Sequence, residues 1–72
     1  MGLENTLSSS LTICVEPWAD EFDLPSGSKF ELTLEGGVEP ALNVILADGR
    51  VTVWVNNGDV VGAEVDGVNV WD

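Results

Sequence analysis

Turn-forming dipeptides recur in the second half of the chain at intervals of nine residues: Asp48-Gly49, Asn57-Gly58 and Asp66-Gly67. Such dipeptides favour two-residue β-hairpin loops, because a type I′ turn needs positive φ at both central positions. The spacing therefore predicts a four-stranded antiparallel meander over residues 41–47, 50–56, 59–65 and 68–72. A nonapeptide β-helix is the alternative for this period, but three units without its glycine-rich calcium consensus favour the meander.

Two-residue loops also fix which residues oppose each other across each hairpin. The predicted register places Val44 opposite Val53 at the first turn and Val55 opposite Val60 at the second. Apolar side chains then lie on both faces of the meander, so the second face needs a cover or a second copy of the chain. A bulge at Gly62 is the alternative, because it exchanges the faces along the third strand.

The first half of the chain supplies further strands. Apolar and polar residues alternate over 11–16 and 29–35, which predicts two strands, and a shorter extended segment over 21–24 leads into a turn at 25–28. Residues 1–9 are polar and serine-rich towards their end, so they are expected to be a frayed N-terminus. Residues 10–72 are predicted to form a single all-β domain, a small antiparallel β-sandwich or barrel of six to seven short strands.

One stretch of the first half resembles a pattern found in small uncharacterised bacterial β-proteins. It comprises Glu16-Pro17-Trp18, Phe22, Leu24-Pro25, Gly27 and Phe30-x-Leu32. In those proteins a strand ends in Glu-Pro-Trp and a second strand follows an L-P-x-G turn. The resemblance covers about residues 16–32 and implies a compact β fold, with no activity attached to it.

The composition restricts the chemistry of the chain. Thirteen Asp and Glu residues stand against two Lys and Arg, which gives a net charge of −11, and His is absent. This field repels nucleic acid and anionic lipid and attracts cationic surfaces, while the lack of imidazole removes the usual catalytic base and metal ligand. Cys14, between Ile13 and Val15, is expected to be a small buried filler. We therefore expect no enzyme activity, no catalytic residue, no metal or cofactor, and no direct contact with nucleic acid or membrane.

The cellular location follows from two features of the sequence. The single cysteine forms no internal disulfide, which suits a reducing compartment. The chain also has neither an apolar run of transmembrane length nor the pattern of a signal peptide. A cytoplasmic location is expected.

The acidic residues divide into two groups. Asp48, Asp59 and Asp66 lie in or beside the turns, whereas seven of the thirteen acids fall within residues 16–39, where turns do not account for them. Trp18 lies within this acidic segment and is expected to be exposed, because so small a chain rarely buries three indoles. The predicted partner-binding residues are Glu16, Trp18, Asp20, Glu21, Asp23, Glu31 and Glu35.

Three interpretations of this composition remain open. The first is a non-enzymatic protein-binding module that docks on a basic protein surface through a Trp-bearing, acid-rimmed surface, with a homo-oligomer formed through the second apolar sheet face. The second is a nucleic-acid mimic, such as a phage-type inhibitor, with a ladder of carboxylates from Glu21, Asp23, Glu31 and Glu35. The third is acidity for solubility or high-salt adaptation. Binding of a hard cation near residues 20–23 is also left open, since their spacing matches no EF-hand.

Overall fold

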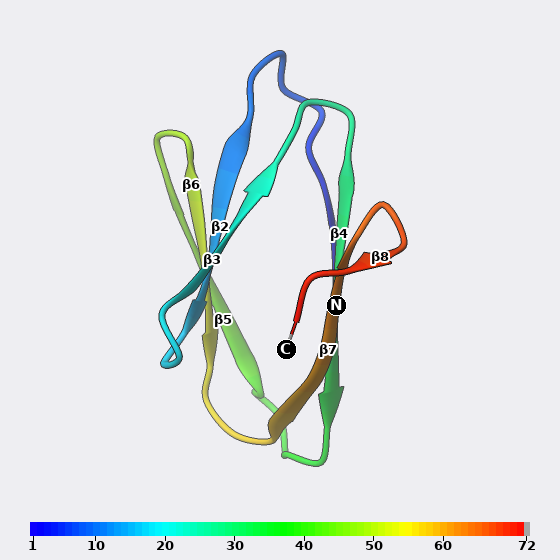
Figure 1. Ribbon diagram of the computed structural model, residues 1–72. Coiled ribbons are helices and arrows are strands. Elements are labelled where there is room, and N and C mark those ends of the chain that lie inside the picture. Colours follow the sequence, from blue (N-terminus) through cyan, green and yellow to red (C-terminus); the bar gives the residue numbers. More distant parts are fainter. Residues whose placement is uncertain (72) are drawn as a thin grey trace.

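The computed structural model describes residues 1–71, in which strands and connecting turns occur but no helix. Consequently no helix in this part of the chain is long and apolar enough to cross a membrane. Eight short strands form two facing four-stranded sheets, so the predicted all-β, sandwich-like class is confirmed (Figure 1). The strands are β1 (Gly2–Glu4), β2 (Leu11–Glu16), β3 (Asp20–Leu24), β4 (Lys29–Glu35), β5 (Leu42–Ala47), β6 (Arg50–Val55), β7 (Asp59–Val65) and β8 (Val68–Asn69).

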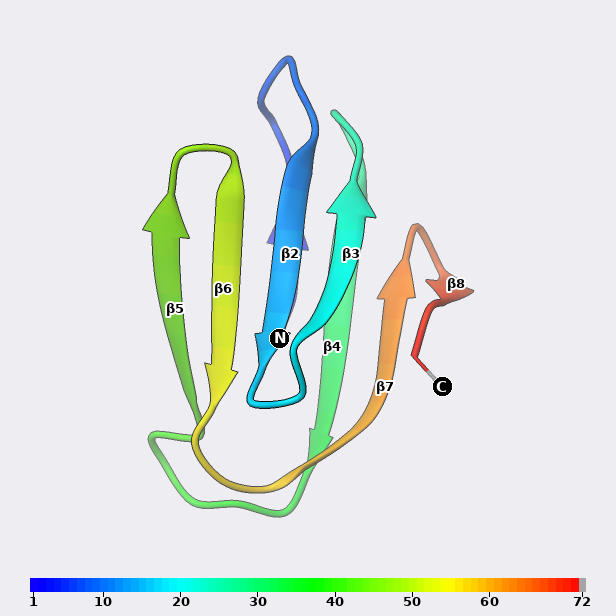
Figure 2. The same cartoon turned by 60° about the vertical axis from the view of Figure 1, so that its left-hand side comes forward.

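The two sheets differ in the way their strands are connected (Figure 2). Sheet I has the order β1-β4-β7-β8 and is antiparallel throughout. Sheet II has the order β3-β2-β6-β5, and within it β2 and β6 run parallel while the other neighbours are antiparallel. The strand count of eight exceeds the predicted six to seven, because β1 is too short for an alternation pattern to reveal it; β8 corresponds to the strand predicted over residues 68–72.

A single core fills the space between the sheets. The alternation predicted for residues 11–16 and 29–35 is confirmed, because every second side chain of β2 and β4 points inward, as in any pleated strand. Phe30 is the largest side chain that is fully buried. The core consists of Ile13, Val15, Leu24, Phe30, Leu32, Val51, Val53, Val55 and Ala63.

Two of the three turn dipeptides form the predicted hairpins. Asp48-Gly49 joins β5 to β6 and places Val44 opposite Val53, and Asp66-Gly67 joins β7 to β8. The predicted four-stranded meander is nevertheless wrong, because Asn57-Gly58 carries the chain from β6 in sheet II to β7 in sheet I (Figure 2).

The crossing at Asn57-Gly58 is held by the neighbouring connection between the sheets, residues 36–41, which joins β4 to β5. The Asn57 side-chain oxygen accepts a hydrogen bond from the Val38 N–H at 2.6 Å, and the Asn56 amide donates to the Pro40 carbonyl at 3.3 Å. Gly58 has φ of +85°, and a Cβ there would lie 3.2 Å from the Gly36 carbonyl oxygen. These long-range contacts override the local preference of Asn-Gly for a hairpin.

Replacing Gly58 by Ala is expected to cost more stability than the same change at Gly49. Both glycines have positive φ, +85° and +70°, but nothing lies within 4 Å of a Cβ built at Gly49. We expect Gly49→Ala to lower the free energy of unfolding by about 1 kcal/mol and Gly58→Ala by about 2–3 kcal/mol, because the second also pushes a methyl group against backbone. Urea denaturation of both variants measures the difference, and equal losses would contradict the close packing of the two connections.

The bulge considered for the third meander strand is present in β7, at Val61. Thr33 pairs with Gly62 and Leu34 with Val60, so the pairing of β4 with β7 skips Val61. The skipped residue exchanges the faces of the strand, as the alternative with a bulge requires, but it is Val61 and not Gly62. Val60 packs against the core on one side of the bulge and Ala63 is buried on the other, while Val61 is exposed.

The N-terminal residues belong to the fold, so the expectation that residues 1–9 are frayed is wrong for the first five of them. β1 pairs with the start of β4, and the Met1 ammonium group donates to the Leu32 carbonyl at 2.8 Å. Met1 and Leu3 pack against the core, and Asn5 is fully buried. A strand of three residues is too short to show alternation of apolar and polar residues, so the sequence did not predict β1.

The second apolar sheet face of the predicted meander does not form as one surface. Its members divide between the sheets, with Ile45 and Trp54 in sheet II and Ala63 and Val65 in sheet I. Ala63 is buried in the core, whereas Ile45 and Trp54 are exposed on the outside of sheet II. The reason is again the crossing at residues 57–58, which places β6 and β7 in different layers.

Candidate binding site

An aromatic cluster extends from the core to the surface along one open side of the sandwich. Phe22 of β3 lies 5.8 Å from the buried Phe30 and 6.3 Å from Trp71, measured between ring centroids. Trp18, in the β2–β3 turn, meets Trp71 edge-to-face at 5.8 Å with an angle of 87° between the rings. Trp18 is 44% exposed, as predicted, although Trp54 on the outside of sheet II is almost equally exposed at 42%.

The local sequence explains why Trp18 stands at the end of a hairpin. Strand β2 ends at Glu16, and the following Pro17 has no N–H with which to continue the ladder. Ala19 then adopts φ of +60°, and Asp20 begins β3 opposite Val15. The turn therefore holds the Trp18 indole outside the ladder but in contact with Trp71.

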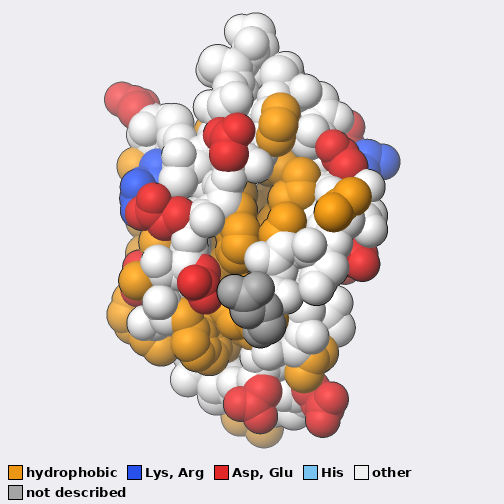
Figure 3. All heavy atoms as spheres, viewed as in Figure 1, with side chains coloured by type: hydrophobic (Ala, Val, Ile, Leu, Met, Phe, Trp, Pro, Cys, Tyr) orange, Lys and Arg blue, Asp and Glu red, His pale blue; other side chains and the backbone are white. Residues whose placement is uncertain are grey.

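These rings line a groove of about 430 Å³ between the two sheets, which we call the aromatic pocket. Asp20 reaches it from sheet II and Asp59 from the start of β7 in sheet I. Figure 3 shows apolar side chains within the groove and carboxylates around it. The complete lining is Trp18, Asp20, Phe22, Asp59, Val60, Val70 and Trp71.

The aromatic pocket combines two features that attract cations. The face of an indole carries negative quadrupole charge and binds ammonium or guanidinium groups placed over it. Two exposed carboxylates on the same lining, Asp20 and Asp59, add formal charge. The arrangement suits a flat or compact cationic group at the surface.

Of the predicted partner-binding residues, the structure brings together only Trp18 and Asp20 in this pocket. Glu21 and Asp23 alternate with Phe22 along β3, so they point to the outer face of sheet II, where Glu16 also lies. Glu31 and Glu35 alternate with buried residues of β4 and point to the outer face of sheet I. The carboxylate ladder expected of a nucleic-acid mimic is therefore not formed.

The structure also adds residues that sequence reasoning did not assign to a site. Asp59 was explained by turn chemistry, and Trp71 was assigned to no site. Both reach the aromatic pocket because the chain crosses from sheet II to sheet I just before β7. No local pattern marks that crossing.

The acids of residues 20–23 were left open as a site for a hard cation. Among residues 1–71, no group of three or more acids or cysteines is arranged to hold a metal ion.

A second groove, also of about 430 Å³, lies along β1, the start of β4 and the β7–β8 end of sheet I. It contains Glu4, Glu31 and Glu64 together with Lys29. Glu31 lies directly opposite Glu64 in the ladder and 3.6 Å from the Met1 ammonium nitrogen. Its aromatic residue, Phe30, is buried, so this groove offers charge without an exposed ring.

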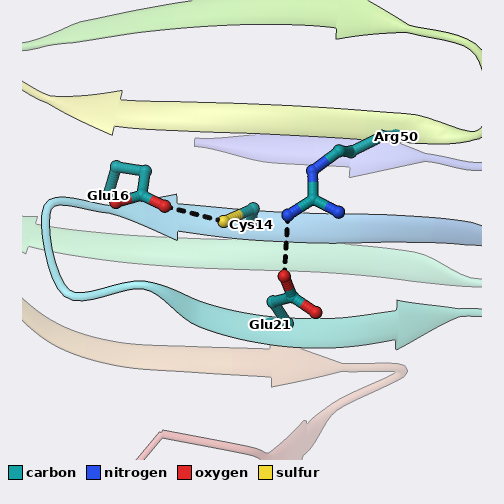
Figure 4. A network of polar contacts seen from close by, with 4 residues as sticks. All are labelled: Cys14, Glu16, Glu21 and Arg50. Atoms are coloured by element: carbon teal, nitrogen blue, oxygen red, sulfur yellow. Dashed lines mark hydrogen bonds and ion pairs between the residues drawn. The ribbon is translucent and has the colours of Figure 1, made fainter.

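On the outer face of sheet II, Cys14 lies within a small polar network (Figure 4). Its Sγ donates to Glu16 Oε1 at 3.0 Å, and beside it Arg50 Nη2 donates to Glu21 Oε2 at 2.7 Å. The hydrogen bond to Glu16 and burial raise the pKa of the Cys14 thiol, and Arg50 offsets this in part. Cys14 is thus a poor nucleophile, and Glu16 and Glu21 are engaged within the protein.

Alkylation of Cys14 is accordingly expected to be slow in the folded protein. The thiol is only 3% exposed and its pKa is raised, so little thiolate is present or accessible at pH 7.5. We expect iodoacetamide to react at least about tenfold more slowly than with the urea-unfolded chain. Glu16→Gln removes the charge that raises the pKa and should speed the reaction. Equal rates in the folded and unfolded chains would contradict the network.

Comparisons with known proteins add no assignment to this geometry. No protein-family model, curated protein or solved structure matches the chain. The resemblance of residues 16–32 to small bacterial β-proteins consequently stays a prediction. What the protein does has to be inferred from the aromatic pocket and from the surfaces around it.

Proposed function

We propose that the protein is a non-enzymatic binding module that docks on a basic protein and takes an arginine side chain of that partner into the aromatic pocket. The observation that carries the proposal is the meeting of Trp18 and Trp71, at 87°, with Asp20 and Asp59 on the lining of one groove. Rings and carboxylates come from both sheets, so the pocket exists only in the folded chain.

Arginine fits this lining better than lysine. Its guanidinium group is planar, so it stacks on an indole face and at the same time donates in a fork to a carboxylate. The ammonium group of lysine is compact and more strongly hydrated, and it gains less from the rings. A cation–π contact contributes about 0.5–2 kcal/mol and a charged hydrogen bond about 1.5–3 kcal/mol, so one pocket gives moderate affinity.

The remaining acids support the same proposal in a different way. A net charge of −11 steers a basic partner towards the protein and raises the association rate at low salt. Glu31 and Glu35 on sheet I and Asp23 on sheet II contribute to this field although they lie outside the aromatic pocket. On this proposal they act on the rate of encounter, and the pocket residues act on the lifetime of the complex.

The proposal is tested with a short peptide, acetyl-Gly-Gly-Arg-Gly-Gly-amide, and a matched peptide that carries citrulline. Citrulline keeps the shape of arginine and loses its charge. Isothermal titration should show the citrulline peptide binding at least about tenfold more weakly, and the corresponding lysine peptide at an intermediate strength. Equal binding of the arginine and citrulline peptides would contradict a cation site.

Matched variants separate the aromatic pocket from general acidity. Trp18→Ala and Asp59→Asn should each weaken arginine binding about five- to tenfold. Trp54→Ala removes an equally exposed indole outside the pocket, and Asp48→Asn removes one charge at a turn where Asn is also favoured. Both controls should bind like the parent protein. If Asp48→Asn weakens binding as much as Asp59→Asn, the peptide responds to net charge and the pocket is not the site.

A further inference from the structure

Strand β5 is an unprotected edge of sheet II. It is the last strand in the order β3-β2-β6-β5, and Figure 2 shows nothing beside it on its open side. Its side chains are exposed on both faces, with Val44 at 47%, Ile45 at 56% and Leu46 at 76%. A strand edge with free backbone groups and apolar side chains is a template for pairing with another strand.

The inner face of β5 is open because sheet I does not cover it. The strand of sheet I on the corresponding edge, β1, has only three residues, and the tip of the β5–β6 hairpin leans away from sheet I in Figure 1. Val44 and Leu46 lie on the same face as the buried Val53 and Val51, their ladder partners. They continue the apolar inner surface of sheet II beyond the part that sheet I covers.

The charges on the edge strands indicate what covers β5. The opposite edge of the same sheet, β3, carries Asp20, Glu21 and Asp23, and β1 carries Glu4, whereas β5 has no charged residue. Charged side chains protect an edge against pairing. An edge without charged side chains offers no ion pair to a basic or acidic partner strand, and it matches an equally uncharged strand. The β5 strand of a second copy meets that requirement.

The backbone of β5 is also suited to pairing with itself. The Asn56 N–H donates to the Ala41 carbonyl at 2.8 Å, so residues 43, 45 and 47 direct their backbone groups to β6, and residues 42, 44 and 46 direct theirs outward. These outward residues are symmetric about Val44. A two-fold axis there pairs Val44 with its own copy and Leu42 with Leu46 of the partner, which satisfies all the outward groups.

We propose that two copies of the chain pair antiparallel through β5, centred on Val44, and join their sheets II into one continuous sheet. This pairing closes as a dimer, because the acids of β3 protect the two ends of the joined sheet against further addition. One six-residue strand from each copy buries a small interface, so the dimer belongs to the weak class. The proposal is independent of the aromatic pocket, which lies on the side of β3 and β8.

Sedimentation equilibrium of the full chain at low and high salt tests the pairing. The two copies repel each other because each has a net charge of −11. Salt shortens the range of this repulsion, from about 30 Å at 0.01 M to about 3 Å at 1 M. We therefore expect dimer formation to strengthen at least about tenfold with added NaCl. A protein that stays monomeric at about 1 mM in high salt, or that forms longer assemblies, would overturn the proposal.

Val44→Glu places two like charges opposite each other on the two-fold axis and should weaken the dimer about tenfold. Val61→Glu adds the same charge at an exposed valine of β7 and should leave the dimer unchanged. Equal effects of the two variants would contradict pairing at β5. A measurement on the parent protein avoids any loss of folding: amide hydrogen exchange at Leu42, Val44 and Leu46 should slow as protein concentration rises. If the exchange rate at these three amides does not depend on protein concentration, pairing centred on Val44 is excluded.

Discussion

Replacing Asn5 by Asp is expected to leave the protein largely unfolded in water at neutral pH. The Asn5 side chain is 1% exposed, and its amide nitrogen donates to the carbonyls of Ser9 at 2.9 Å and Leu24 at 3.0 Å. Its oxygen accepts from the Leu7 N–H at 3.0 Å. An ionised carboxylate has no donor, so it would face two carbonyl oxygens and lose both bonds. Such a buried unpaired charge costs several kcal/mol, about the whole stability of a domain this small.

Asn5→Ala is the control for this prediction. It removes the same hydrogen bonds without burying a charge, and we expect a loss of about 2–4 kcal/mol in the free energy of unfolding. Thermal unfolding followed by circular dichroism compares the three proteins at pH 7. Because burial favours the protonated acid, the difference between the Asp and Ala variants should shrink as pH falls. An Asp variant that melts with the parent protein would show that residues 5–9 do not hold the N-terminus in place.

Phe30→Ala is expected to cost about 3–5 kcal/mol, the second largest effect. Phe30 is 1% exposed in the middle of the core and supports Phe22, whose ring lies 5.8 Å away. Truncation therefore leaves a cavity between the sheets and removes the base of the aromatic cluster. Guanidinium denaturation measures the loss. Phe22→Ala is the matched control, since Phe22 is only half-buried and its loss should be smaller; a larger loss at Phe22 would contradict the assignment of the core.

The parts of the fold that the sequence predicts correctly are those with local causes. Strands β2 and β4 follow from the alternation of apolar and polar residues, since a pleated strand with one buried face requires it. The hairpins at Asp48-Gly49 and Asp66-Gly67 follow from the need for positive φ in a tight turn; Asp66 and Gly67 both show it, and at the first turn Gly49 does. Here the local preference and the long-range packing agree.

The parts that the sequence does not predict depend on contacts between distant residues. Asn57-Gly58 has the same local preference as the other turns, but Val38 and Pro40 hold it in a crossing between the sheets. Trp18 and Asp20 are recognisable as candidates because an exposed indole beside acids is visible in the sequence. Asp59 and Trp71 join them in the aromatic pocket only through that crossing. The other five predicted residues point to the outer faces of the two sheets, because side chains alternate between the two faces of each strand.

The central claim is that the aromatic pocket binds a cationic side chain, and the indole N–H signals of the three tryptophans test it most directly. We titrate the ¹⁵N-labelled protein with the arginine peptide and follow these signals by two-dimensional NMR. The account predicts saturable shifts of Trp18 and Trp71, absent with the citrulline peptide, and an unmoved Trp54. Shifts of Trp54 alone, or of all three without saturation, would contradict it.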